Sequence, residues 1–370
     1  MNKGDSTIST ILNSGYHRTK TELDKKNNSS HLLFGGNVDY RFGGFYVGAT
    51  AAYTSLDKEL VPKTTSVYRR YYAHGKEFYN VGVNYGYTGS RLSFSGETAT
   101  GGCKAVATIN SLSYSITDRL TMLALQRFYS YKYYSLFAES FNEGGAVQNE
   151  SGIYLGMTWR PSQALNIIAY IDYAYFAWPK YQASKSSCSL DNTLQLTYVM
   201  PRWIFSARYR LKIREKDNKD KTDLINKIDH RARFSAAYSF GAWKAKTQAD
   251  LAFSSYKENS FGWMITQNAN YILKKRLNIN VSFSYFNTDS YDSRVYSYEK
   301  GMLYSYYFPS FYGHGIRGSL FASYDILKQV TLFAKVGTTK YFDREIIGSS
   351  YQQINHSSAT DLELQLRIKL

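Results

Sequence analysis

The strongest constraint on this chain is an alternation of apolar and polar side chains with a period of two. Successive side chains of a β-strand point to opposite faces of a sheet, whereas an amphipathic helix repeats about every 3.6 residues. In the last ten residues one face carries Leu362, Leu364, Leu366, Ile368 and Leu370, and the other carries Asp361, Glu363, Gln365, Arg367 and Lys369. Similar alternation marks residues 79–87, 153–160, 203–214 and 277–285. The pattern predicts an all-β fold.

The connections between these segments alternate between tight turns and longer polar loops. Tight turns are predicted near residues 43–44, 89–90, 117–118, 161–162, 201, 241, 274–275 and 327–328. Loops are predicted around residues 58–76, 135–150, 180–190, 215–227, 287–301 and 343–358, with shorter ones near 101–104 and 257–261. Strands of about ten residues, joined by short turns on one side and longer loops on the other, are typical of outer-membrane barrels.

The predicted strands start near residues 31, 45, 77, 91, 104, 119, 151, 165, 189, 202, 228, 243, 261, 276, 315, 329 and 358. A soluble β-sandwich or propeller would also alternate, but its strands are usually five or six residues long. Here the apolar face is aromatic towards the strand ends, and the other face carries charges in mid-strand, as a wet lumen permits. We therefore predict a transmembrane antiparallel up-and-down β-barrel of about 16 to 18 strands over residues 31–370, located in the outer membrane of a Gram-negative bacterium.

Composition excludes several other classes of protein. No apolar run approaches the roughly 20 residues that a spanning helix needs. The two cysteines, Cys103 and Cys188, have no zinc-site spacing, so no metal is expected, and their positions in the predicted loops leave a disulfide between them open. The net charge of +16 suits anionic partners, such as lipopolysaccharide or acidic solutes. No residues of this chain specifically support nucleic-acid binding.

Residues 1–30 are predicted to be a polar outer loop or the remnant of a preceding strand. Single-chain bacterial barrels have an even number of strands, with both ends of the chain in the periplasm. The predicted count is odd, and residues 1–30 contain no apolar segment typical of a secretory signal. Both features predict that an N-terminal part of the barrel is missing from this sequence. The alternative is that the predicted strand count is wrong by one.

Several short motifs resemble those of a known family. They are residues 14–19 (SGYHRT), 95–97 (SGE), 148–156 (QNESGIYLG), 170–173 (YIDY), 178–181 (WPKY) and 296–299 (YSYE). These motifs are similar to the barrel region of Bacteroidetes outer-membrane proteins whose precursors carry a helix-hairpin-helix region before the barrel. The resemblance implies location and architecture. It implies no biochemical role, and the helix-hairpin-helix region itself is absent here.

The candidate functional residues are mainly basic. Alternation places Arg208, Arg210, Lys212 and Arg214 on the same side as Arg231 and Arg233 of the next strand, and Lys244 and Lys246 of the one after. Such a basic wall would favour anions in a pore. Alternatively, these residues pair with Asp229, Asp250 and loop carboxylates, or with a plug, and conduct nothing.

Four carboxylates, Glu97, Glu150, Asp172 and Glu299, are expected at the lumen or its mouth. Hydrogen bonding to lumenal arginines such as Arg127 and Arg160 explains them more simply than acid–base catalysis does. Most histidines fall in predicted loops, and no serine, histidine and acid can be grouped from spacing. No catalytic residue, enzymatic activity or cofactor is predicted.

Three functions are therefore compared. The first is a porin-like conduit in the lipid bilayer that favours anionic solutes. The second is a non-conducting barrel that acts as a scaffold for an outer-membrane assembly with unidentified proteins. The third, an outer-membrane hydrolase, has the least support from the sequence.

Overall fold

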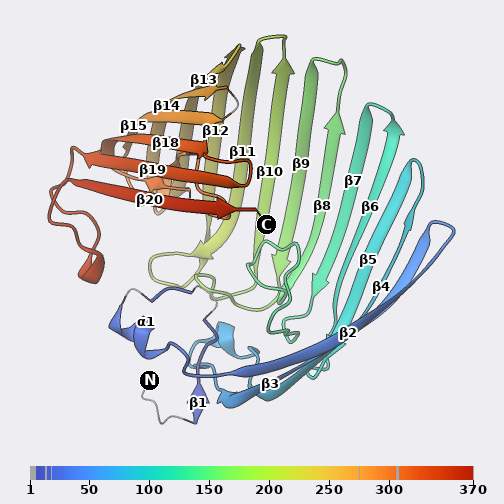
Figure 1. Ribbon diagram of the computed structural model, residues 1–370. Coiled ribbons are helices and arrows are strands. Elements are labelled where there is room, and N and C mark those ends of the chain that lie inside the picture. Colours follow the sequence, from blue (N-terminus) through green and yellow to red (C-terminus); the bar gives the residue numbers. More distant parts are fainter. Residues whose placement is uncertain (1–5, 13–14, 18, 275, 306–307, 370) are drawn as a thin grey trace. The chain divides into compact units, whose positions relative to one another are not determined.

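The computed structural model describes residues 6–12, 15–17, 19–274, 276–305 and 308–369, and in them most of the chain is β-strand. The described strands form one sheet of 18 strands and one of two strands. Figure 1 shows the larger sheet as a succession of long hairpins. Parts of the predicted N-terminal loop, Lys275 of a predicted turn and Leu370 of the last strand lie outside the described residues.

The elements in the first part of the chain are mostly long strands. They are β1 (Thr7–Ile8), α1 (Lys20–Asp24), β2 (His31–Phe42), β3 (Phe45–Leu60), η1 (Val67–Arg69), β4 (Gly75–Thr88), β5 (Leu92–Gly101), β6 (Ala107–Thr117), β7 (Leu120–Tyr129), β8 (Glu150–Trp159), β9 (Leu165–Phe176) and β10 (Ser187–Val199). The remaining elements are β11 (Trp203–Asp217), β12 (Leu224–Phe240), β13 (Trp243–Tyr256), β14 (Glu258–Leu273), β15 (Leu277–Thr288), η2 (Tyr291–Ser293), β16 (Val295–Tyr296), β17 (Ser310–Phe311), β18 (His314–Asp325), β19 (Val330–Tyr341), η3 (Ser350–Gln352) and β20 (Ser358–Ile368).

The long strands confirm the predicted fold class. The predicted starts match β2 to β15 and β18 to β20 to within a few residues, the largest difference being Leu224 for the predicted 228. The strands are antiparallel hairpin neighbours, as in the pairing of β2 with β3 from His31↔Leu56 to Phe42↔Phe45. Period-two alternation locates strands well because it is a local consequence of the extended backbone.

The tight turns also lie where the sequence predicts them. Between β2 and β3, Gly43 and Gly44 have φ angles of 51° and 88°, and both residues join directly paired strand ends. A two-residue hairpin turn with both φ angles positive follows the natural twist of the strands, and glycine adopts it without strain. The sequence Gly43-Gly44 therefore fixes the register of this hairpin.

Two predicted loops differ from the structure. The loop expected at 257–261 is reduced to Lys257, whose φ of 41° lets Tyr256 pair directly with Glu258. The loop expected at 287–301 runs instead from residue 289 to 313, and it contains η2 and the small sheet β16–β17. Alternation does not mark either boundary, because polar residues occur both in these loops and on the polar face of the strands.

Residues 6–30 hold more structure than a loop. β1 pairs in parallel with the end of β3, and Ile8 is buried with Leu56, Leu60 and Phe78. Thr19 caps α1, since its side chain accepts a hydrogen bond from the Glu22 amide while the Glu22 carboxylate accepts one from the Thr19 amide. Cys103 and Cys188 are free thiols, so the disulfide that the sequence left open is not formed.

The chain divides into two compact units. The first contains Met1–Trp159, Ala169–Asn192 and Ile213–Asn226, and the second contains Arg160–Ile168, Thr193–Lys212 and Lys227–Leu370. In the first unit β2 pairs with β3, and in the second β20 pairs with β19.

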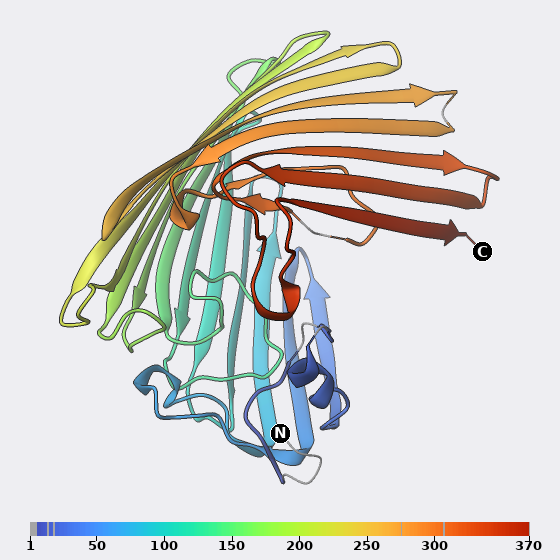
Figure 2. The same ribbon diagram turned by 90° about the vertical axis from the view of Figure 1, so that its left-hand side faces the viewer.

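Each unit presents an apolar and a polar face. In the second unit, Leu362 and Leu364 of β20 are each 70% exposed, whereas Lys335 and Thr339 on the opposite face of the neighbouring β19 are buried. Figures 1 and 2 show β18, β19 and β20 side by side in red. We call the polar side the inner face and the apolar side the outward face. Surrounding lipid requires this arrangement, in which polar groups are buried on the inner face and leucines are exposed on the outward face.

Candidate functional site

The basic residues of β12 and β13 share the inner face of the second unit. The strand register places Arg231 opposite Ala252, Arg233 opposite Asp250, Ala237 opposite Lys246 and Ser239 opposite Lys244. The two lysines therefore lie nearer the tight turn at Gly241 than the two arginines do. The basic residues of β12 and β13 therefore lie at different heights along the strands and do not form a row across them.

The arginines of the wall are engaged by neighbouring groups. Arg233 forms an ion pair with Asp250 at 2.6 Å, and the ring of Tyr298 lies 4.6 Å from its guanidinium carbon. Arg231 donates to the main-chain oxygen of Arg294 at 3.1 Å and lies over the ring of Tyr296. The segment 289–313 thus covers part of the basic face. Asp250, the partner of Arg233, is one of the carboxylates named in the sequence analysis, whereas Arg231 contacts a main-chain oxygen and an aromatic ring.

The β11 residues of the predicted wall are half-buried. Arg208, Arg210 and Lys212 belong to the second unit, and Arg210 lies near enough to Arg231 for their like charges to repel. Arg214 belongs to the first unit. Alternation still assigns all four to the inner face.

Lys244 and Lys246 differ from the arginines. Within the described residues, neither ammonium group has an ion-pair or hydrogen-bond partner. Lys246 is repelled by Arg233 and attracted by Asp250, but Asp250 already binds Arg233 and the amide of Gln248. Lys244 lies near Lys300 of the segment 289–313, which adds another positive charge. Within the described residues, Lys244 and Lys246 therefore carry free positive charge of the wall.

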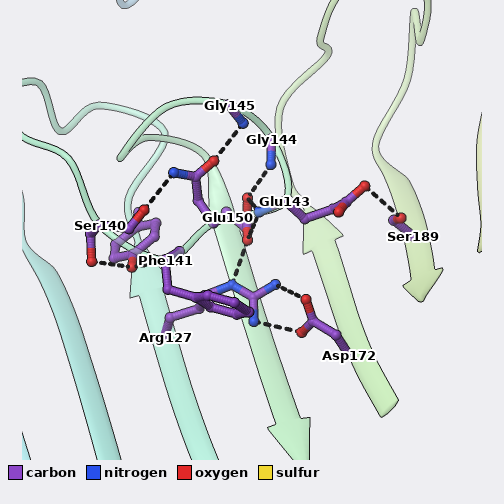
Figure 3. Close-up of polar contacts among 11 residues, drawn as sticks. Arg127, Ser140, Phe141, Glu143, Gly144, Gly145, Glu150, Asp172 and Ser189 are labelled. Carbon is purple, nitrogen blue, oxygen red and sulfur yellow. Dashed lines mark hydrogen bonds and ion pairs between the residues drawn. The ribbon is translucent and has the colours of Figure 1, made fainter. Parts of the chain in front are cut away.

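Three of the four predicted carboxylates belong to buried ion clusters, two of them with Arg127. Arg127 on β7 is fully buried; its Nε lies 2.5 Å from Glu150, and its two terminal nitrogens donate to Asp172 at 2.7 and 3.2 Å. Glu150 also accepts hydrogen bonds from the backbone amides of Glu143 and Gly144. Figure 3 shows Arg127 between these two carboxylates, with the residue 143–145 loop against Glu150.

The loop between β7 and β8 is held to the wall by further contacts. Phe141 lies 5.1 Å from the Arg127 guanidinium carbon, and Glu143 accepts a hydrogen bond from Ser189 at 3.2 Å. Tyr129 donates to the main-chain oxygen of Phe141 at 2.8 Å. This loop, residues 130–149, therefore folds against the inner face of the first unit. Glu97 remains exposed on β5 of the same unit.

Glu299 belongs to the corresponding cluster in the second unit. Its carboxylate accepts from Arg317 of β18 at 2.9 and 3.1 Å and lies 3.2 Å from the Lys335 ammonium of β19. Arg317 also donates to Asp361 of β20 at 2.5 and 3.1 Å. Sequence reasoning named Glu299 but missed its partners. Alternation already placed Asp361 on the polar face of the last strand, which is the signal that could have found it.

Two histidine side chains, those of His230 and His314, form hydrogen bonds with tyrosines. Tyr209 lies 2.7 Å from His230, and Tyr285 lies 2.6 Å from His314. Within the part of the chain that the structure describes, no group of three or more histidine, cysteine, aspartate or glutamate residues could hold a metal. Among the same residues, no α-helix has the length and apolar character needed to cross a membrane.

Comparison with known proteins supports the fold. No family model matches the chain. No curated protein matches it in sequence. Its structure is similar to that of the copper transporter OprC, with 11% identity, a TM-score of 0.51 and coverage of 85% of this chain and 61% of that one. It is also similar to the siderophore receptor PirA from Acinetobacter baumannii, with 11% identity, a TM-score of 0.50 and coverage of 92% of this chain and 62% of that one. The chain has an outer-membrane β-barrel fold.

A third similar structure is that of the outer-membrane expressed OmpT of Vibrio cholerae, with 11% identity, a TM-score of 0.42 and coverage of 90% of this chain and 99% of that one. At these identities the likeness concerns the fold alone. An outer-membrane barrel protein has its apolar face in the outer membrane of a Gram-negative bacterium, and the outward leucines of β20 suit that position.

Proposed function

We propose that this outer-membrane barrel protein is a narrow passive conduit that favours small anionic solutes. The observation that carries the proposal is the pair Lys244 and Lys246, whose ammonium groups have no counter-ion among the described residues of the inner face. Unpaired positive charge on a pore wall lowers the free energy of a passing anion and raises that of a cation. The net charge of +16 adds long-range attraction for anions.

The inward segments account for a narrow pathway. Residues 130–149 in the first unit and 289–305 in the second lie against the inner face of their own unit. Backbone amides of the first segment donate to the buried Glu150, and Glu299 of the second forms an ion pair with the buried Arg317. Buried ion pairs with several hydrogen bonds hold a segment in one position because releasing it leaves charges without partners. Such segments restrict a lumen to small solutes.

The same segments favour a second function, a non-conducting scaffold. If they seal the lumen, the basic face serves only to hold them. Pull-down from native membranes that returns no stable partner protein would count against the scaffold. The hydrolase alternative has no supporting observation among the described residues, because the histidine side-chain bonds at His230 and His314 go to tyrosines. The resemblance to Bacteroidetes barrel proteins stays a prediction.

Ion selectivity in planar lipid bilayers tests the conduit. With a salt gradient across the bilayer, the reversal potential of the protein should show preference for chloride over potassium. The double variant Lys244→Gln and Lys246→Gln should move this potential towards zero. Lys328→Gln, in the turn between β18 and β19, removes a positive charge of the same unit away from the wall and should leave it unchanged. A sealed protein, or a cation-selective one, would refute the proposal.

A further inference from the structure

A polar cavity lies between the inner face of the second unit and the segment 289–313. It has a volume of about 290 Å³. Its lining comes from three neighbouring strands and the segment, and consists of Lys246, Gln248, Thr266, Asn268, Asn280, Tyr298, Glu299 and Lys300. All of these residues lie within one compact unit, so the cavity is a feature of that unit alone.

The charge that the cavity offers to a ligand is positive. Its carboxylate, Glu299, is already neutralised by Arg317 and Lys335 and is 1% exposed. Its two ammonium groups, on Lys246 and Lys300, have no ion-pair partner in the described part of the chain. Lys300 contacts the Phe321 ring at 5.1 Å, which satisfies the cation only in part. An anion placed between these lysines would supply the missing counter-charge.

The remaining lining offers hydrogen bonds rather than apolar surface. The strand register sets Lys246 opposite Asn268, and Gln248 opposite Thr266. Asn268 in turn lies opposite Ser282, whose buried hydroxyl has no hydrogen-bond partner within the described residues. Side-chain amides both donate and accept hydrogen bonds, so they suit a ligand with several hydroxyl groups. A simple inorganic ion would leave most of these groups unused.

The volume sets the size of the ligand. At roughly 30 Å³ for each water in the liquid, the cavity holds about ten water-sized groups. We propose that it binds a small hydroxyl-rich carboxylate, of the sugar-acid type, with its carboxylate between Lys246 and Lys300 and its hydroxyls on Asn268 and Asn280. This inference rests on the proposed conduit for anions and names its solute class. The cavity would be a selective binding site for that solute on the inner face.

Isothermal titration calorimetry on the folded chain in detergent micelles tests the site, with gluconate as the probe. Two further probes separate recognition of the hydroxyl groups from recognition of the carboxylate. They are sorbitol, a neutral polyol of similar size, and acetate, a carboxylate without hydroxyls. Gluconate should bind more tightly than either. Lys246→Gln and Lys300→Gln should each weaken gluconate binding roughly tenfold, as expected for loss of a charged hydrogen bond. Lys328→Gln is the matched control and should bind as the unaltered protein does.

Asn280→Asp gives a second measurement that keeps the side-chain size. The added negative charge should weaken gluconate binding and leave sorbitol binding unchanged. Equal affinity for gluconate and sorbitol, or gluconate binding insensitive to both lysine substitutions, would overturn the site. The calorimetric result does not depend on conduction. Gluconate binding by a protein that is sealed in bilayers would refute the conduit and keep the site, whereas anion-selective conduction without gluconate binding would refute the site alone.

Discussion

The two units each hold an inward segment with a buried ion cluster, but the segments contribute differently to their clusters. In the first unit, Arg127, Glu150 and Asp172 all belong to strands, and the loop 130–149 adds backbone amides. In the second unit, the segment 289–313 contributes a charged side chain, Glu299, which bridges Arg317 and Lys335. The loop 130–149 therefore joins its ion cluster through backbone amides, and the segment 289–313 joins its cluster through the Glu299 carboxylate.

This difference has a consequence for mutation. No single side chain of the loop 130–149 carries its attachment to Glu150, because backbone amides are present whatever the residue type. Instead, the wall residues control that loop. In the second unit, replacing one loop residue removes the bridge, while Arg317 keeps Asp361 as a partner. The first cluster should thus be more important for stability, and the second more easily released.

The largest effect is expected from Arg127→Met. It leaves Glu150 and Asp172 buried without their cation, which should destabilise the folded protein by about 3–5 kcal/mol. Urea unfolding in detergent, followed by circular dichroism, measures the loss. Arg91→Met, at an exposed turn of the same unit, serves as the control and should change the stability little. A loss no greater than that of the control would show that the cluster is not a main stabilising feature of the first unit.

Glu150→Gln should have the next largest effect. The neutral amide keeps the shape but weakens the contacts with Arg127 and with the amides of Glu143 and Gly144, costing about 2–3 kcal/mol. The loop 130–149 should become more sensitive to limited proteolysis. Glu139→Gln, on the exposed part of the same loop, is the matched control. Equal cleavage rates in the two variants would contradict a role for Glu150 in holding the loop.

The strands of both units could be predicted from the sequence, whereas the attachments of the loops could not. Alternation and turn residues act over a few positions, so they indicated the strands from β2 to β15 and the Gly43-Gly44 turn. They also placed Arg127 and Asp172 on a common face. Glu299, however, meets Arg317 and Lys335 only after the segment folds back over the strands, and no local periodicity encodes such a contact.

The same limit applies to the basic wall. Its shared face was predictable, because register follows from the tight turn at Gly241. The difference between the engaged Arg231 and Arg233 and the unpaired Lys244 and Lys246 of the described wall was not predictable. Tyr296 and Tyr298 reach the two arginines from a distant segment. Asp250, directly opposite Arg233, was named in advance as a candidate partner, since cross-strand neighbours lie within ion-pair distance.

A smaller effect on stability is expected from Glu299→Gln. Arg317 retains Asp361, and Lys335 has Glu363 at 3.8 Å, so the loss should be on the order of 1–2 kcal/mol. The effect on the attachment of the segment 289–313 should be larger than this small loss of stability. In limited proteolysis, Glu299→Gln should be cleaved within residues 297–305 faster than the control variant Glu345→Gln is. Glu345 is exposed in the loop before β20. If cleavage stays unchanged while stability falls, the bridge stabilises the wall without holding the segment.

The smallest effect concerns alkaline pH and sharpens the contrast between the segments. Tyr133 is buried in the loop 130–149 against Ala105, Ala107 and Tyr129. Burial, with added repulsion from Cys103 and Glu97, raises the pKa of Tyr133 to about 12. Because its folded pKa lies above the unfolded value of about 10, its contribution to stability is fully present below pH 10 and is lost as pH rises towards 12.

The difference in urea stability between the unaltered protein and Tyr133→Phe measures this contribution without interference from the other tyrosines. Between pH 9 and pH 11.5, the unaltered protein should lose more stability than Tyr133→Phe does. Tyr304, in the other segment, is 87% exposed, and Tyr304→Phe should show the same pH dependence as the unaltered protein. Identical pH dependence in all three proteins would show that Tyr133 is not held in a buried position that raises its pKa.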